Sequence, residues 1–132
     1  MVEPKYYDVQ INLYVTNVEI SVRFYSENFG FVETFRTPKE GTPVHVELKL
    51  GNFVLGLAHI GAAKSMHGLD VGGGKPSGEV LVWTDNVDNA YTVLINKGVK
   101  SISKPHTFLD TLRAAWVADP DGYPIEIVTK LK

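Results

Sequence analysis

Apolar and polar residues alternate with a period of two near the N-terminus, which is typical of a strand with one buried face. The apolar positions are Val9, Ile11, Leu13 and Val15, and the positions between them are Gln10, Asn12 and Tyr14. The spacing then becomes helical, with apolar residues at Val18, Val22, Tyr25 and Phe29. Gly30 stands where such a helix should end, because glycine adopts the left-handed cap conformation at little cost. A strand followed by an amphipathic helix is therefore expected.

The same pattern returns in the second half of the chain. Asn17, Val18 and Glu19 match Asn86, Val87 and Asp88, at an offset of 69 positions, and such self-similarity indicates a repeated unit. Asn17 in the first copy, and Asp85 or Asn86 in the second, are expected to cap a helix with a side-chain oxygen. Three strands are predicted after each helix, near 32–37, 44–50 and 53–59, and near 99–104, 111–118 and 123–129. The sequence predicts two βαβββ modules.

This repeat predicts an α+β fold in which two βαβββ modules form a cupped mixed sheet with the helices on the outside. A single domain over residues 1–132 is expected, with module one at about 7–60, a linker at about 61–77 and module two at about 78–130. The linker contains Gly72-Gly73-Gly74 and Pro76, which favour an exposed connection. Each sheet has one face for its helix, and the two remaining faces are expected to share a concave surface.

Strand parity predicts which side chains line this cup. They are Gln10, Asn12, Tyr14, His45 and Glu47 in the first half, and Glu79, Leu81, Trp83, Arg113 and Glu126 in the second. Tyr14 and Trp83 hold equivalent positions, where their rings can stack on a planar or cationic ligand. If Glu79 and Glu126 lie close together, the pKa of one carboxyl is raised and it could act as an acid or base; the favoured alternative is that they are solvated, pair with Arg113 or hydrogen-bond a polar ligand. Trp116 is expected in the core, and His106 in a loop after Pro105.

Composition narrows the class of protein. The 132 residues include 13 basic and 15 acidic side chains, a net charge of −2, and no cysteine. The charges are intermixed, so neither nucleic acid nor a membrane is an expected partner. Without cysteine there is no disulfide, thiolate metal site or cysteine nucleophile. The N-terminal residues lack the apolar run of a secretory signal, and we expect a cytoplasmic protein.

Three segments make the chain resemble the vicinal oxygen chelate superfamily of glyoxalases, bleomycin-resistance proteins and extradiol dioxygenases. They are 10–30, 79–98 and the ending Asp119-Pro120-Asp121-Gly122-Tyr123-Pro124-Ile125-Glu126. For a glyoxalase I type, the resemblance implies metal ligands at the positions of Gln10 (His or Gln), Gly56 (Glu), Glu79 (His) and Glu126 (Glu). For an extradiol dioxygenase type, it implies His, His and Glu at the positions of Gln10, Glu79 and Glu126. This sequence departs from both sets: Gly56 has no side chain to offer, Glu79 replaces a histidine, and only Gln10 and Glu126 are ligands that the superfamily permits.

The departures favour a binding protein of the bleomycin-resistance type, which the resemblance describes as a metal-free homodimer with aromatic and acidic clefts. It would sequester a planar or cationic ligand with no cofactor. The alternative is a divalent-metal-dependent lyase or isomerase, or a dioxygenase-like enzyme, with Gln10, Glu79 and Glu126 as tentative ligands and Glu126 moving a proton. A thiol transferase that inactivates an antibiotic is a further possibility within the resemblance.

Overall fold

The computed structural model describes residues 3–132; Met1 and Val2, which belong to the predicted domain range, lie outside the described residues. The chain divides into two compact units, one ending at Val71 and the other beginning at Gly72. This boundary falls inside the segment predicted as a linker. In the described part of the chain, no helix has the length and apolar character needed to span a membrane. The prediction of a single domain with a shared cup remains a prediction.

The first unit contains a four-stranded mixed sheet. Its elements are β1 (Ile11–Val15), α1 (Val18–Phe29), β2 (Val32–Thr37), β3 (His45–Leu50), β4 (Phe53–His59) and α2 (Ile60–His67). The strand order is β1-β4-β3-β2, with β1 parallel to β4 and the other pairs antiparallel. The Asn17 side chain accepts a hydrogen bond from the backbone of Ile20 at 3.1 Å, and Gly30 ends α1 in the left-handed conformation. The first predicted βαβββ module is thus confirmed.

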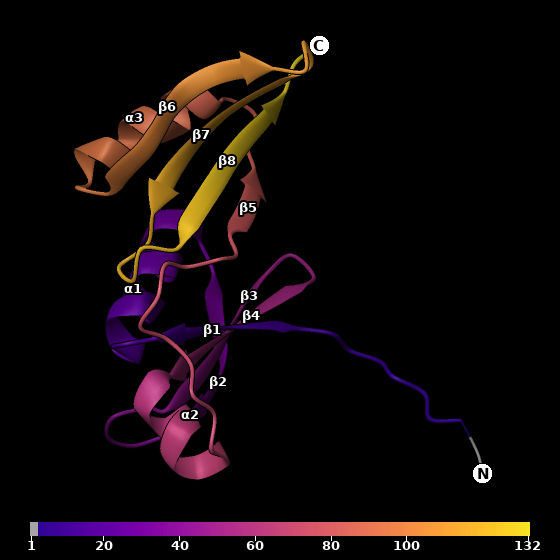
Figure 1. Ribbon diagram of the computed structural model, residues 1–132. Helices are drawn as coiled ribbons and strands as arrows, with labels where there is room; N and C mark the ends of the chain where they lie inside the picture. The colour runs from indigo at the N-terminus through magenta and orange to yellow at the C-terminus, as the bar shows by residue number, and fades with distance from the viewer. Residues whose placement is uncertain (1–2) are drawn as a thin grey trace. The chain divides into compact units, whose positions relative to one another are not determined.

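The second unit repeats this arrangement (Figure 1). Its elements are β5 (Val80–Trp83), α3 (Val87–Asn96), β6 (Lys100–Phe108), β7 (Leu112–Ala118) and β8 (Pro124–Lys130), and the order is β5-β8-β7-β6. The β5 and β8 strands are parallel, as β1 and β4 are. The Asn86 side chain caps α3 by accepting from the backbone of Asn89 at 3.1 Å. The predicted fold class, α+β with two βαβββ modules, is confirmed.

In each unit, the helix that follows the first strand packs on the apolar face of the sheet. The fully buried residues include Val15, Val46, Leu48, Leu55 and Leu57 beside Tyr25 of α1, and Val117, Ile125 and Ile127 beside Val87 of α3. Burying each aliphatic side chain contributes about 1.5–3 kcal/mol before entropy is subtracted, so this face fixes the strand registers. We call the other face of each sheet, turned away from α1 or α3, its open face.

Two elements differ from the sequence expectations. Residues 60–67 form α2, a helix that the sequence analysis did not contain; its small residues Gly61, Ala62 and Ala63 show no amphipathic period. The second difference is that β6 continues to Phe108, which places His106 in a strand rather than in the expected loop. Pro105 is tolerated there because β6 is an edge strand with an irregular register.

Candidate functional site

Four polar side chains form a hydrogen-bonded network on the open face of the first sheet. The Gln10 amide nitrogen donates to Asn12 Oδ1 at 3.0 Å and to Glu47 Oε2 at 3.2 Å. His45 Nε2 lies 3.1 Å from the same carboxylate oxygen. The sequence had placed all four residues on this face, and the structure brings them together.

Gly56 lies at the centre of this network. It is opposite Asn12 on one side and Glu47 on the other. A Cβ added to Gly56 would lie 2.0 Å from Asn12 Oδ1 and 3.1 Å from the His45 ring. Any side chain here, including the glutamate that the resemblance implied, therefore has no room unless Asn12 moves.

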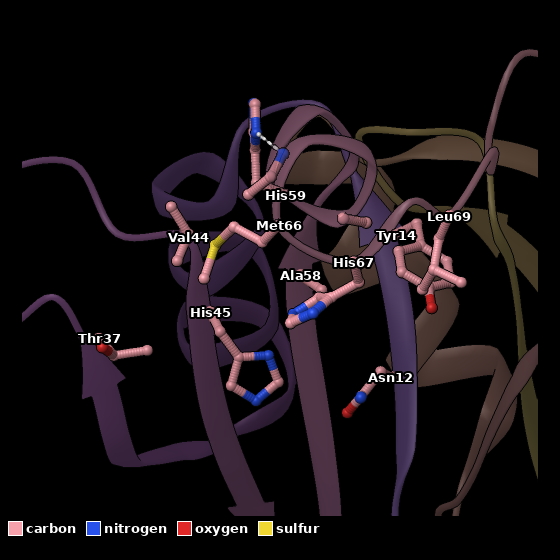
Figure 2. A pocket seen from close by; sticks show the side chains of 12 residues that line it. Asn12, Tyr14, Thr37, Val44, His45, Ala58, His59, Met66, His67 and Leu69 are labelled. Atoms are coloured by element: carbon pink, nitrogen blue, oxygen red, sulfur yellow. Dashed lines mark hydrogen bonds between the residues drawn. The ribbon is translucent and has the colours of Figure 1, made fainter.

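A pocket of about 390 Å³ lies beside the network, between the sheet and α2. It is lined by Asn12, Tyr14, Thr37, Val44, His45, Ala58, His59, Ala62, Ala63, Met66, His67 and Leu69. Figure 2 shows the rings of His45 and His67 and the Asn12 amide directed toward one another in this space. Sequence reasoning missed His59 and His67 as lining residues, because it did not contain the helix that positions them.

On the open face of the second sheet, Glu79 and Glu126 form a carboxyl pair. Burial raises the pKa of Glu126, and a hydrogen bond and charge repulsion from Glu79 raise it further. Only 9% of Glu126 is exposed. The Trp116 indole nitrogen donates to Glu79 Oε1 at 3.2 Å. Of the two alternatives that the sequence left open, the geometry matches the close carboxyl pair, and the role of Glu79 and Glu126 as site residues stays a prediction.

Three aromatic rings gather beside this pair. His106 and Trp116 stack with ring centroids 5.7 Å apart and planes 20° apart, and Phe108 lies 6.1–6.4 Å from both. The expectation that Trp116 is a core residue was wrong. Trp116 lies opposite Glu126 in the β7–β8 register, and so it shares the open face. The turn at 119–123 is the signal that would have placed it correctly: it sets Ala118 opposite Pro124, and two residues further along each strand Trp116 lies opposite Glu126.

Arg113 does not belong to the open face, which corrects the sequence expectation. Its guanidinium donates to both carboxylate oxygens of Asp88, at 2.7 and 2.8 Å, and Asp88 lies in the first turn of α3. Arg113 also shares its parity in β7 with buried Ala115 and Val117. A one-residue error in strand parity had moved the side chain to the wrong face.

Leu81 and Trp83 lie on the open face of the second sheet, as predicted. They are 45% and 62% exposed. Trp83 lines a separate shallow hollow of about 600 Å³ with Asp85, Lys130 and Lys132, among others. The two lysines make this hollow less suitable for a cation than the surface around Trp116.

Comparison with known protein families shows which family the chain belongs to. Residues 9–127 match the family model described as Glyoxalase/Bleomycin resistance protein/Dioxygenase superfamily. The chain belongs to this superfamily. A search of the curated proteins finds no match.

Solved structures of this superfamily and others share the fold of the chain. TioX from Micromonospora sp. ML1 is 23% identical, with a TM-score of 0.76 over 94% of this chain and 99% of that one. A superfamily member from Sphaerobacter thermophilus DSM 20745 is 25% identical, with a TM-score of 0.72 over 95% and 98%. Lactoylglutathione lyase from Agrobacterium tumefaciens is 18% identical, with a TM-score of 0.72 over 92% of each chain. Similarity at these identities supports the architecture.

Members of the glyoxalase superfamily often use a divalent metal, and the ligands predicted for one here are divided between the two units. Among residues 3–132, no three histidine, cysteine, aspartate or glutamate side chains are grouped so that they could hold an ion. Gln10 is hydrogen-bonded within the first unit, and Glu79 and Glu126 are engaged with each other and with Trp116 in the second. Oxygen donors of this kind suit Mg²⁺ or Mn²⁺ better than zinc. The predicted metal site at Gln10, Glu79 and Glu126 stays a prediction.

Proposed function

We propose that this chain is a small-molecule-binding protein that holds a planar, cationic ligand on the open face of its second unit. The observation that carries the proposal is the cluster of His106, Phe108 and Trp116, in which His106 and Trp116 stack, directly beside the Glu79–Glu126 carboxyl pair. Aromatic faces attract cations by roughly 0.5–2 kcal/mol for each contact. A neighbouring carboxylate adds charge complementarity, so one surface supplies both the flat contact and the counter-charge.

The first unit supports the choice of binding over metal chemistry. Gly56 occupies the position at which a glyoxalase-type site has a glutamate ligand, and Asn12 fills the space above it. The rival function, a divalent-metal-dependent lyase or isomerase, is favoured by one observation: Glu126 is a buried carboxyl whose raised pKa suits it to hold and release a proton. In that case Glu126 would act as the acid or base and Glu79 would position it.

Calorimetry with two ligands of the same ring system tests the proposal. At about pH 7.5, 9-aminoacridine is a planar cation and acridine is uncharged, so the pair isolates the effect of charge. We expect the cation to bind about tenfold more tightly, and Trp116→Leu and Glu79→Gln each to weaken it by a similar factor. Trp83→Leu is the matched control, because Trp83 is exposed on the same face but lies beside lysines.

Two results would reject the proposal in favour of the enzyme. One is equal affinity for the two acridines, unchanged by Trp116→Leu. The other is stoichiometric uptake of Mn²⁺ or Zn²⁺ that is lost in Glu126→Gln. The resemblance also leads us to propose a homodimer, which sedimentation of the purified chain tests.

A further inference from the structure

We propose that the first unit contains a separate binding site, the pocket between its sheet and α2, and that this site takes an uncharged, flat aromatic molecule that carries a hydroxyl group. The site uses none of the residues assigned to the cationic ligand above. It therefore stands or falls independently of the proposed function.

The size and the walls of the pocket suit a small ring system. Its volume of about 390 Å³ lies within the range of about 300–1,000 Å³ that is usual for ligand pockets. The α2 side contributes the apolar side chains of Ala62, Ala63 and Met66, with Leu69 after it, and at its end His67 turns its ring toward the polar groups of the sheet. The sheet side contributes polar groups, which Figure 2 shows at the opposite wall. A flat apolar body with one polar end matches this division.

The hydrogen bond between His45 and Glu47 fixes what His45 offers to a ligand. A carboxylate oxygen only accepts hydrogen bonds, so the proton that lies between His45 Nε2 and Glu47 Oε2 is carried by the imidazole. The neutral ring then has its other nitrogen, Nδ1, free of hydrogen. That nitrogen accepts a hydrogen bond, and a ligand hydroxyl is the group that donates one. Glu47 is a positioning residue because it acts through His45.

The remaining polar groups favour a ligand oxygen that also accepts. Asn12 Oδ1 is occupied by the Gln10 amide, which leaves the Asn12 NH₂ group as a donor. His59 Nδ1 accepts from the backbone nitrogen of Ala62 at 3.2 Å, and so its proton resides on Nε2. A hydroxyl is the small group that donates and accepts at one atom, which matches an acceptor at His45 and a donor at Asn12.

Charge disfavours an anionic ligand. Among the described residues that line the pocket there is no Lys or Arg. A carboxylate that entered would lose water without gaining a fixed cation, and it would approach the Glu47 carboxylate that is hydrogen-bonded to His45. An uncharged hydroxyl loses less on entry and recovers two hydrogen bonds.

The experiment is a calorimetric titration with three probes of equal ring size: 2-naphthol, its methyl ether and 2-naphthoate. The methyl ether cannot donate, and the carboxylate is charged. We expect 2-naphthol to bind about tenfold more tightly than either of the others, which is the effect of one well-placed hydrogen bond. His45→Phe keeps a ring without nitrogen and should abolish this preference; Tyr7→Phe, at an exposed ring outside both proposed sites, is the control and should retain it.

Two further variants separate ligand recognition from folding. Ala62→Leu fills the pocket from α2 and should weaken all three probes, with an unchanged circular dichroism spectrum. In Glu47→Gln the His45 ring is no longer held in one tautomer, so the ratio of naphthol to methyl ether affinity should fall toward one while the ether affinity stays the same. Equal affinities for the three probes, no binding of 2-naphthol at millimolar concentration, or a preference that survives His45→Phe would overturn the proposal.

Discussion

The two units have the same element order and strand pairing, yet their open faces carry different chemistry. At the centre of the first open face, Gly56 is surrounded by amide, imidazole and carboxylate groups that are hydrogen-bonded to one another. At the equivalent place in the second, Glu126 is buried beside another carboxyl and a ring stack. The helix α2 also covers part of the first open face, and the described residues of the second unit contain no counterpart of this helix.

This contrast shows which part of a repeated sequence is constrained by folding. The apolar faces of both sheets must bury similar side chains against a helix, and they remain alike in pattern. The open faces contribute less to folding, so their residues are free to serve a ligand. Two different ligand surfaces can then exist on one repeated scaffold.

Among the substitutions that probe the difference between the two units, Gly56→Ala should cause the largest loss of unfolding free energy. The new Cβ would overlap Asn12 Oδ1 and crowd the His45 ring. Because Asn12 is exposed and can turn aside, the cost comes from its lost hydrogen bond with Gln10 and from the crowded His45 ring, about 1–2 kcal/mol in unfolding free energy. Urea denaturation measures the loss. In the Asn12→Gly background, Gly56→Ala should cost less, because the overlapping atoms and their hydrogen bond are already absent. A Gly56→Ala chain as stable as the original would show that the network is loosely held and not a specific feature of the first unit.

A smaller effect is expected at the helix starts, where the two units should respond alike. Asn17→Ala and Asn86→Ala each remove one side-chain acceptor from a backbone amide of the first turn, at a cost of about 1 kcal/mol each. Replacement by serine, which also caps, serves as the control. If Asn17→Ala and Asn86→Ala differ in their loss of unfolding free energy by much more than about 1 kcal/mol, the two modules are not equivalent at their helix starts.

The smallest expected effect is a change in how the stability of the chain depends on pH, and it arises in the second unit alone. Because the pKa of Glu126 is raised in the folded chain, its stabilising contribution is complete below the ordinary value of 4.5 and is lost as pH rises through the raised pKa. Glu126→Gln cannot ionise, so its unfolding midpoint should fall less than that of the original chain between about pH 4 and about pH 7. Exposed Glu3→Gln is the control. Identical pH profiles for the original chain and Glu126→Gln would contradict the raised pKa.

The fold could be predicted because its determinants are periodic. The alternation in β1 and the repeated Asn-Val-acid segment at 17–19 and 86–88 predicted both modules, and the bounds of β2 and β4 agree to the residue. The helix α2 escaped prediction because its eight residues bury only Ala63 and have no apolar stripe. Propensity alone is a weak signal in so short a segment.

The candidate site was predictable only in part. Parity placed Gln10, Asn12, His45 and Glu47 on one face, and the structure links them by hydrogen bonds. Parity failed for Arg113 and Trp116, since an error of one position in β7 exchanges the two faces. The pairing of Arg113 with Asp88 depends on a contact between residues 25 positions apart, which no local pattern reveals.

The sparse burial of α2 has a consequence for ligand exchange. A helix that buries a single residue, Ala63, is held by little apolar area, so its local opening should need far less free energy than unfolding of the sheet beneath it. Entry to and departure from the adjacent pocket would then follow fraying of this one helix, on a timescale of microseconds to seconds. The residence time of a bound molecule would thereby be set independently of the thermal stability of the unit as a whole.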